Sequence, residues 1–278
     1  MRPLRPRPHL TRPIWAGDRL ARELGKGDGP GDRVGESWEV WRDNLVDGGA
    51  RLGDLAELPI LVKLLDVRER LSVQVHPDDA AARRLEGAPH GKSEGWVVLR
   101  AEPGAKVAYG LSRELSAEEL ADRARSGAIE DDLAWMPVVP GDVIDVPAGT
   151  IHAIGGGILL YEVQQPCDLT YRLYDWGRPR PLQLDKAVAV ARRSPMPAPR
   201  NPDGDLLFDT AHFRLERVRL GGVRETPWCA LTVVEGRAEV AGVEVVVGST
   251  VVLPPGRWEL AGEGVALVAS AGSNRRGT

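Results

Sequence analysis

Apolar and polar residues alternate along most of this chain, in short segments that glycine and proline separate. The segments ILVKLL, LSVQVHP, GWVVLRA and KVAYGL, which follow one another from about Leu61, have the alternation typical of strands. GESWEVW at Gly35–Trp41 is a further predicted strand, with Trp38 on one face and Glu39 on the other. Strands are also predicted at 142–146, at 158–164 and, in several pieces, from 212 to about 270. The pattern therefore predicts a mostly β protein.

One pattern of turns and apolar residues occurs twice. Gly141–His152 reads GDVIDVPAGTIH, and Gly248–Glu259 repeats its glycine turn, apolar strand and Pro-x-Gly corner as GSTVVLPPGRWE. Such a repeat predicts one β-barrel that is built twice. Glu259 stands where the first copy has His152, so only the first copy keeps an imidazole that could bind a metal. We expect a two-barrel protein with one working site, in which the second barrel is structural support.

A convincing helical pattern occurs once. SAEE at Ser116–Glu119 is a capping box, and it predicts a helix over about Ala117–Arg125 with a short second piece to Leu133. The segment SPMPAPRNPDGD at 194–205 is the clearest linker. We therefore predict a metal-binding catalytic domain at 1–193, with a small helical insertion near 116–133, and a degenerate second barrel at 206–272. The polar C-terminal tail GSNRRGT is expected to be disordered.

Composition narrows the class of protein. A formal net charge of −4 gives no basic field for nucleic acid, so any anion site has to be local. No stretch approaches the roughly 20 apolar residues of a transmembrane helix, and no apolar run follows the basic N-terminus. Cys167 and Cys229 are expected to be unpaired thiols in a reducing compartment. We expect a cytoplasmic protein that has neither nucleic acid nor a membrane as its partner.

Four residues have the side-chain types that bind a divalent metal. On LSVQVHP, Gln74 and His76 point to the same side, because strand side chains alternate, and they can bind one ion together. Glu94 and His152 come from other predicted strands, and two imidazoles with a carboxylate suit zinc or a similar ion. The alternative is that the two histidines are isolated polar residues near turns. The other histidines, at 9, 90 and 212, are expected to have no such role.

Several charged residues could serve a phosphorylated substrate. Only five of the 36 basic residues are lysines, which draws attention to Lys63 and Lys92, since arginine does not replace a lysine at a reactive site. These two lysines, Arg172 and Arg178 could neutralise a phosphate or polarise a carbonyl. Glu162 lies among apolar neighbours in LLYEVQQ, so its carboxylate is either paired or has a raised pKa useful for proton transfer. The alternative is that all of them are solvated surface charges.

Several motifs in this order look like those of type I phosphomannose isomerase in its short bacterial form. GESWEV at Gly35 fits that family, and the motifs that carry the resemblance most clearly are LVKLLD at Leu61–Asp66, LSVQVHPDD at Leu71–Asp79, GKSEGW at Gly91–Trp96, PAGTIHAIGGG at Pro147–Gly157 and DLTYRLYDWGR at Asp168–Arg178. The resemblance runs from about Ile14 to Gln183 and continues more weakly through the second predicted barrel. It departs from the family where Lys-Ser-Glu replaces the usual Lys-Thr-Glu, where Gly156 replaces the asparagine of the wider cupin pattern, and where the helical domain is short.

The resemblance implies a zinc-dependent enzyme with two cupin-type (jelly-roll) barrels that interconverts mannose 6-phosphate and fructose 6-phosphate through a cis-enediol. It implies one Zn²⁺ per chain on Gln74, His76, Glu94 and His152. It places Lys63, Lys92, Glu162 and Arg172 in the active site. The sequence does not identify the catalytic base: Glu162 is the first choice, and a histidine beside the metal or a lysine with a lowered pKa is the second. We expect a monomer or weak homodimer. Two alternatives stay open: an isomerase of another sugar or sugar phosphate, and a sugar-binding cupin without catalysis.

Overall fold

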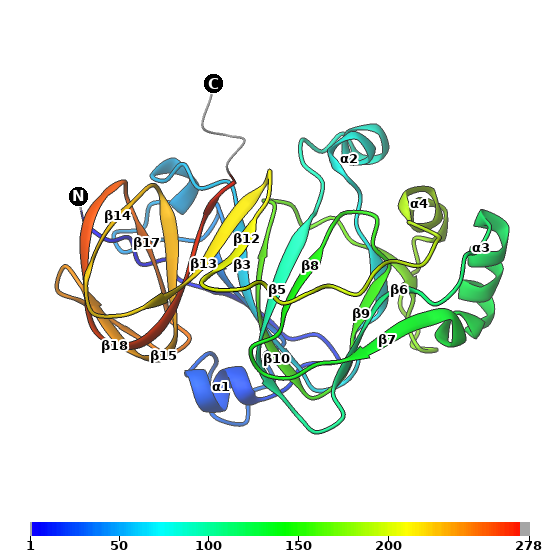
Figure 1. Cartoon of the computed structure of the whole chain (residues 1–278), viewed down its shortest axis with the longest axis horizontal. Coiled ribbons are helices and arrows are strands. Elements are labelled where there is room, and N and C mark those ends of the chain that lie inside the picture. The colour runs from blue at the N-terminus through cyan, green and yellow to red at the C-terminus, as the bar shows by residue number, and fades with distance from the viewer. Residues whose placement is uncertain (1, 273–278) are drawn as a thin grey trace.

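The computed structural model describes residues 2–272, and its strands pair antiparallel in three sheets (Figure 1). The prediction of a mostly β protein is confirmed. The central sheet has six strands in the order β1 (His9–Thr11), β2 (Glu36–Val40), β3 (Leu61–Val67), β10 (Ile158–Gln164), β5 (Glu94–Ala101) and β8 (Val143–Val146). Each strand predicted from the alternation between 35 and 164 is present near its expected place.

The two other sheets lie on either side of the central one. The second sheet carries β11 (Tyr171–Tyr174), β4 (Val73–Val75), β9 (His152–Ile154), β6 (Lys106–Leu111) and β7 (Leu133–Pro137). The third sheet belongs to the C-terminal part of the chain and has the order β12 (Leu206–Asp209), β13 (Phe213–Arg219), β18 (Gly256–Ala271), β15 (Cys229–Val240) and β16 (Val243–Val246). Two short strands complete it: β14 (Val223–Thr226) pairs with β18, and β17 (Thr250–Leu253) pairs with β15.

The predicted helix is present, and its capping box explains where it begins. The Ser116 hydroxyl accepts from the Glu119 N–H, the Glu119 carboxylate accepts from the Ser116 N–H, and helix α3 (Ala117–Ser126) follows, with the 3₁₀ turn η2 (Ala128–Asp132) after it. The sequence analysis missed the short elements α1 (Arg19–Leu24), η1 (Leu52–Asp54), α2 (Asp79–Glu86) and α4 (Leu184–Val190). Helices of six to eight residues are too short for a clear 3.6-residue period. In Figure 1, α3 and α4 lie at the end opposite the third sheet.

The central sheet has two faces of different character, because side chains alternate along its strands. Leu159, Tyr161 and Val163 of β10 belong to a core cluster that also contains Leu207, Phe213 and other residues of the third sheet. Ile158 and Leu160 belong to a second cluster, shared with Val107 and Ile154 of the second sheet. The central sheet is therefore buried on both faces, and it joins the C-terminal part of the chain to the part predicted to carry the site.

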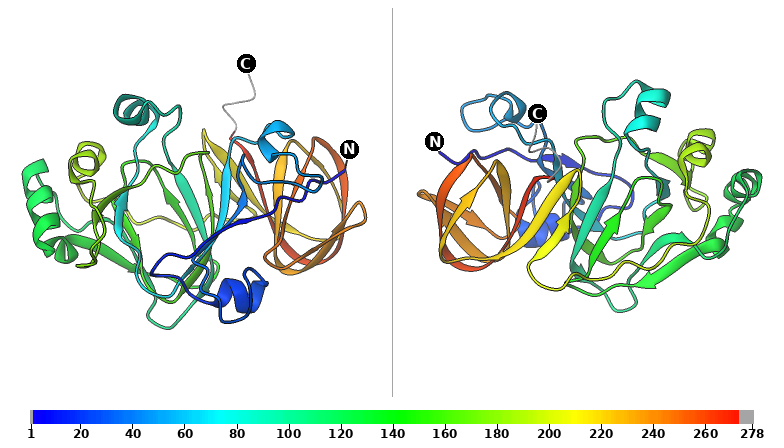
Figure 2. Two further views of the ribbon diagram at one scale, coloured as in Figure 1. Left: turned by 180° about the vertical axis from the view of Figure 1, so that it is seen from behind. Right: turned by 45° about the horizontal axis from the view of Figure 1, so that its top comes forward.

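The N-terminal segment runs from the third sheet to the central one (Figure 2). Leu4 and Val252 exchange both backbone hydrogen bonds, at 2.8 and 2.9 Å, and β1 then pairs with β2. The segment at 194–205 has no helix or strand, as predicted for a linker, but it is docked on the protein. The Asn201 side-chain oxygen accepts from the Val143 N–H at 2.7 Å, and its amide donates to Asp142 at 2.9 Å.

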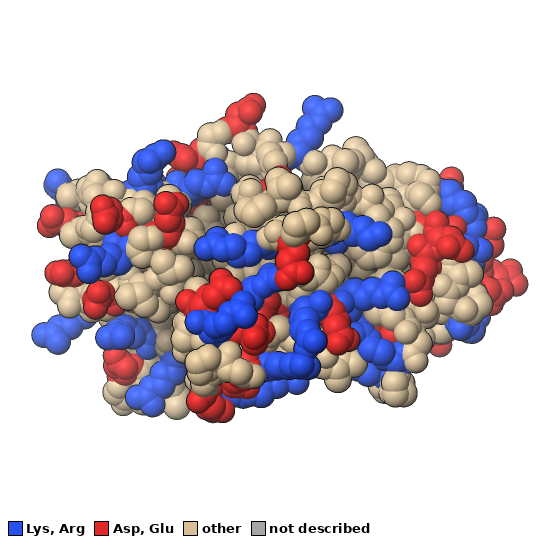
Figure 3. All heavy atoms as spheres, turned by 90° about the horizontal axis from the view of Figure 1, so that it is seen from below, with Lys and Arg blue, Asp and Glu red and all other residues tan. Residues whose placement is uncertain are grey.

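The structure bears on several expectations drawn from composition. Cys167 and Cys229 are buried and unpaired, as predicted. None of the helices within residues 2–272 has the length and apolar run needed to cross a membrane. Basic and acidic side chains are interspersed on the face seen from below in Figure 3. The predicted disordered tail falls almost wholly on 273–278, outside the described residues.

Gly95 of β5 tests how tightly the central and third sheets are packed. A Cβ atom at this position would lie 2.7 Å from the Phe208 ring, although the Gly95 backbone does not require glycine. We expect Gly95→Ala to lower the free energy of unfolding by about 1–3 kcal/mol, the usual cost of overpacking a core. Urea denaturation measures the change.

A double-mutant cycle separates this contact from other causes. Phe208→Leu alone should destabilise the protein, but in the Gly95→Ala background it should cost less or restore stability, because it removes the clash. Strictly additive losses would show that the two residues do not press on each other.

Candidate metal centre and active site

Three neighbouring strands of the central sheet place charged side chains on the face toward the second sheet. Glu162 of β10 lies directly opposite Lys63 of β3 on one side and Trp96 of β5 on the other. Two residues further along β10, Gln164 lies opposite Glu94 of β5. Residues that are directly opposite share a face, so Lys63, Glu162 and Glu94 all point away from the third sheet.

The second sheet supplies the facing row. Gln74 of β4 pairs with His152 of β9 and, on its other side, with Arg172 of β11. The predicted alternation of this strand is confirmed, since Val73 and Val75 are in a core cluster while Ser72 and Gln74 line a cavity. His76 follows the end of β4. The Gln74 amide donates to the Ser72 hydroxyl at 3.1 Å, which orients it.

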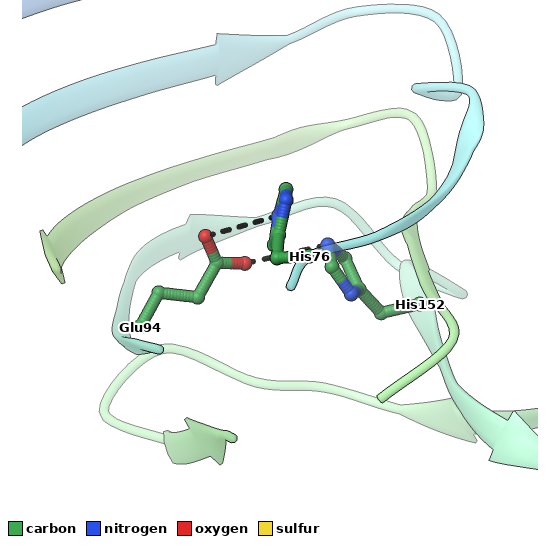
Figure 4. A group of neighbouring side chains, drawn as sticks. All are labelled: His76, Glu94 and His152. Carbon is green, nitrogen blue, oxygen red and sulfur yellow. Dashed lines mark ion pairs between the residues drawn. The ribbon is translucent and has the colours of Figure 1, made fainter. Parts of the chain in front are cut away.

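Two imidazoles and a carboxylate meet between these sheets (Figure 4). Glu94 Oε2 lies 3.4 Å from His76 Nε2, and its Oε1 lies 3.3 Å from His152 Nε2. One ligand atom from each residue lies within 4.8 Å of the others, and all three side chains are buried. His76 Nδ1 is 2.9 Å from the Leu169 carbonyl, and His152 Nδ1 is 2.9 Å from the Thr150 carbonyl. Each Nδ1 therefore carries the proton, and each Nε2 lone pair is directed at the cluster.

The charges in this cluster favour a bound cation. Burial, helped by the positive charge of Lys92, lowers the pKa of His76 to about 3, and burial also lowers the pKa of His152. Burial opposes the ionisation of Glu94, but Lys92 and the imidazoles hold its pKa well below the ordinary value. Lys92 Nζ lies 2.7 Å from Glu94 Oε2 and 3.2 Å from His76 Nε2. The cluster therefore offers two neutral imidazoles and one anionic carboxylate, and the carboxylate already contacts the ammonium group of Lys92. Such a donor set fits a divalent metal ion.

A cavity of about 340 Å³ opens beside the cluster. It brings together most of the residues singled out in the sequence, and those in its lining are Lys63, Gln74, Lys92, Glu94, His152, Glu162 and Arg172. His76 is not in the lining but contacts Glu94 and Lys92 behind it. Three larger cavities, of about 370, 530 and 710 Å³, contain none of these residues, so size does not identify the site.

Lys63 is a buried cation held among acidic groups. Its Nζ lies 3.8 Å from both Glu36 and Glu162 and 3.4 Å from Asp168. Lys63 Nζ also lies over the face of the Trp38 ring, 4.4 Å from its centroid, in a cation–π contact. Burial acts to lower the pKa of Lys63, but Glu36 and Glu162 outweigh it, and the pKa is raised. Lys63 is therefore charged at neutral pH.

Glu162 is a buried carboxyl group with one oxygen bonded and one not. The Trp96 indole N–H donates to Oε2 at 3.1 Å, whereas Oε1 is buried and has no hydrogen bond. Burial, together with the negative charge of Glu94, raises the pKa of Glu162 to about 7 in spite of Lys92 and Lys63. A carboxyl group with a pKa near 7 can both accept and release a proton at neutral pH.

The arginines are arranged differently from the sequence expectation. Arg172 lines the cavity, and its Nη1 donates to the Pro181 carbonyl at 2.7 Å. Arg178, a candidate for phosphate binding, is not in the lining; it pairs with Asp175 and donates to the Arg70 carbonyl. Arg180 lines the cavity instead. Of these two arginines, only Arg180 therefore lies in the lining of the cavity.

Sequence reasoning missed several residues of the cavity. Glu36, Trp38 and Trp96 could have been found, because strand alternation places them on the same face as Lys63 and Glu94. Asp168 and Arg180 lie on irregular segments that carry no such signal.

Comparison with known proteins was made on both sequence and structure. Residues 36–94 match the family model "Phosphomannose isomerase type I, catalytic domain". Mannose-6-phosphate isomerase ManA of Bacillus subtilis is 31% identical over an alignment of 309 positions that covers 95% of this chain and 96% of that protein. Mannose-6-phosphate isomerase of Streptococcus mutans is 38% identical over 208 aligned positions, which cover 65% of each protein, just under two thirds of its length.

A solved structure agrees with the sequence matches. The crystal structure of a mannose 6-phosphate isomerase from Bacillus subtilis superposes with a TM-score of 0.86 and 27% identity, and covers 97% of this chain and 99% of that one. The similarity extends over the third sheet as well as over the sheets that carry the site. The chain therefore belongs to the type I phosphomannose isomerase family.

Proposed function

We propose that this protein interconverts mannose 6-phosphate and fructose 6-phosphate. The observation that carries the proposal is one cavity that contains a carboxyl group with a pKa near 7, buried lysines and a cluster of metal-type donors. An aldose–ketose isomerisation needs these groups: a base for the proton that moves between C2 and C1, and positive charge beside the two oxygens of the enediol.

Glu162 is our choice for the base. Its Oε1 has no hydrogen-bond partner, so this oxygen is available to take the proton from C2 of the open-chain aldose and return it to C1. The proton of the C2 hydroxyl moves to the carbonyl oxygen at C1, which completes the cis-enediol route to the ketose. Lys63, 3.8 Å from Oε1, keeps a positive charge beside the base, and Lys92 and Arg172 stabilise charge on the enediol oxygens.

His76, Glu94 and His152, with the amide of Gln74, are the residues that would hold a metal. Two imidazoles, a carboxylate and an amide oxygen favour Zn²⁺, one per chain. When bound, zinc supplies a Lewis acid that orients and polarises the oxygens of the sugar. The residues themselves fix the site: the Leu169 and Thr150 carbonyls hold both rings with Nε2 toward Glu94.

The finer architecture is part of the same proposal. We infer that the central and second sheets are the two halves of one cupin-type barrel at 1–193, and that the third sheet at 206–272 is a second, degenerate barrel joined by the linker at 194–205. A monomer or weak homodimer in the cytoplasm, with a sugar phosphate as its small-molecule partner, completes the assignment.

Another sugar or sugar phosphate is the second candidate substrate. The polar cavity, with four cationic side chains in its lining, favours a phosphorylated sugar. A coupled assay with mannose 6-phosphate and with a panel of aldoses separates the two candidates. Conversion of a different aldose at a higher kcat/KM would replace the proposed substrate, and binding of sugars without turnover would replace the enzyme by a binding protein.

Replacing one proposed ligand tests the metal. We expect His152→Ala to lose bound zinc and to lower isomerase activity by at least about 100-fold, since ligands act as a set. Metal content by mass spectrometry of the purified protein and the coupled assay are the measurements. His212→Ala, outside the cavity, is the matched control and should keep both metal and activity. A metal-free His152→Ala protein with full activity would contradict the scheme.

The role of Glu162 predicts a pH dependence. Below a pKa of about 7 the carboxyl group is protonated and cannot take the C2 proton, so kcat/KM should fall as the pH is lowered through 7. Trp96→Phe removes a donor to the carboxylate, which disfavours the charged form and raises its pKa. The acidic limb of the profile should therefore move to higher pH in this variant. An unchanged acidic limb would argue that Glu162 is not the base.

A further inference from the structure

Strand pairing positions some residues of the metal centre but not all of them. Glu94 begins β5 and lies in the ladder between Gln164 of β10 and Val146 of β8. His76 follows the end of β4, and Lys92 precedes β5, so neither residue is held by a ladder. Contacts outside the sheets therefore set where His76 and Lys92 lie relative to Glu94.

The chain leaves the site after His76, forms α2 and returns to the site at Lys92. In Figure 1, α2 lies at the top of the view. Asp79, the first residue of α2, closes the base of this loop, because its Oδ1 accepts from the Gly91 N–H at 2.8 Å. The Lys92 N–H donates to the Pro77 carbonyl at 2.9 Å. A Cβ atom on Gly91 would lie 2.4 Å from the Pro77 carbonyl oxygen, so the two segments approach each other as closely as glycine allows.

Gln165, the residue after β10, joins both segments through one buried side chain. Its Oε1 accepts from the Ser93 N–H at 2.9 Å, and its Nε2 donates to Asp79 Oδ1 at 2.8 Å. Its own N–H donates to the Ser93 carbonyl at 3.1 Å, so Gln165 holds both backbone polar groups of Ser93. Only 1% of Gln165 is exposed, and this orientation of its amide is the one that matches a donor with an acceptor on both sides.

Ser93 extends this connection to the segment that carries His152. The Ser93 hydroxyl oxygen accepts from the Ala148 N–H at 3.2 Å. On the same segment, the Gly149 N–H donates to the His76 carbonyl at 2.8 Å. Hydrogen bonds outside the sheets therefore join the three segments that carry the imidazoles and the carboxylate of the metal centre.

Gln165 and Asp79 stand behind the cavity. Neither is in its lining, so they affect the site only through the residues that they hold. Burial opposes the ionisation of Asp79, but the Gly91 N–H and the Gln165 amide keep its pKa below the ordinary value. The bridge from Gln165 therefore ends on a charged acceptor, and hydrogen bonds of this kind are stronger than those between neutral groups.

We propose that Gln165 is a positioning residue, which sets the distance between the segment of His76 and the segment of Lys92 and Glu94. This inference rests on the metal site of the proposed function, because it concerns how the chain arranges that site before an ion binds. Donors that are already held in place lose less freedom on binding, so a preformed arrangement binds an ion more tightly. Loss of the bridge should therefore weaken metal binding.

Replacing Gln165 tests this role. Gln165→Met keeps the length of the side chain and removes both of its hydrogen bonds. We expect the dissociation constant of Zn²⁺ to rise by about 10- to 100-fold, the usual range for residues that orient metal ligands. Competition with a chromophoric chelator measures this constant in the absence of substrate. Any loss of isomerase activity at saturating zinc should appear in kcat, with KM for mannose 6-phosphate within about threefold of wild type, since no cavity residue is changed.

Asp79 provides a second pair of variants, which keeps the test valid if Gln165→Met does not fold. Asp79→Ala removes the acceptor of both Gln165 and Gly91, and it should weaken zinc binding by a similar factor. Asp79→Asn retains an Oδ1 that can accept both bonds, and it should keep most of the affinity. The double variant Gln165→Met/Asp79→Ala should lose less than the product of the two single effects, because both changes remove the same bond.

Asn201→Leu is the matched control. Asn201 makes the same two kinds of hydrogen bond as Gln165, since it accepts from the Val143 N–H and donates to the Asp142 carboxylate, but it is not in the lining of the cavity. Its zinc dissociation constant should stay near wild type. If folded Gln165→Met and Asp79→Ala proteins, checked by thermal melting, bind zinc as tightly as this control, the inference is overturned.

The outcomes distinguish this inference from the proposed function. A wild-type protein that binds zinc but does not convert mannose 6-phosphate would overturn the proposed activity, and the chelator competition would still decide the role of Gln165. Weaker zinc binding in Gln165→Met and Asp79→Ala, but not in Asn201→Leu, would then support that role. A wild-type protein that binds no zinc would overturn both the metal assignment and this inference.

Discussion

The six-stranded central sheet must bury both of its faces, and most of the structure follows from that constraint. Alternation along β10 gives one face to Leu159, Tyr161 and Val163, which pack with the third sheet, and the other face to Glu162 and its apolar neighbours. A fixed apolar layer on one side therefore supports charged groups on the other. The third sheet contributes no residue to the catalytic cavity, yet through this layer it holds the strands that carry Lys63, Glu94 and Glu162.

Burying those charges is costly, and the contacts show how the cost is offset. Glu94 has the Lys92 ammonium and two imidazoles around it, and Lys63 has three carboxylates and an indole ring. Glu162 is the exception, because it is close to another acid and its Oε1 lies 3.8 Å from Lys63 Nζ, whereas Glu94 Oε2 lies 2.7 Å from Lys92 Nζ. Its pKa near 7 is the result of that incomplete compensation. The least satisfied carboxyl group of the cavity is thus the one best suited to exchange a proton.

How far the sequence predicts this site depends on whether a residue lies on a regular strand. The parity of LSVQVHP placed Gln74 correctly, and the same rule could have found Trp38 and Trp96, since both lie on predicted strands. Strand alternation makes no prediction after Tyr174, because the strand ends there and the chain turns at Trp176, whose φ is 56°. Arg178 and Arg180 each lie directly beside a glycine or a proline, and only the tertiary path of that turn decides which one reaches the cavity. The short helices α1, α2 and α4 were missed because packing, rather than periodicity, stabilises them.

The two copies of the internal repeat differ at the position of the metal-type histidine. Both copies begin at a glycine with positive φ, Gly141 at 97° and Gly248 at 80°, and continue in four-residue strands, β8 and β17. They differ after the Pro-x-Gly corner: His152 is buried at the start of β9, whereas β18 buries Trp258 and leaves Glu259 exposed. The indole of Trp258 donates to the Pro254 carbonyl and packs in an apolar cluster with Leu253 and Leu260. The inward-facing side chain thus differs by one position between the two copies. In the second copy it is a tryptophan packed in an apolar core, whereas in the first it is the imidazole of His152, which lines the cavity.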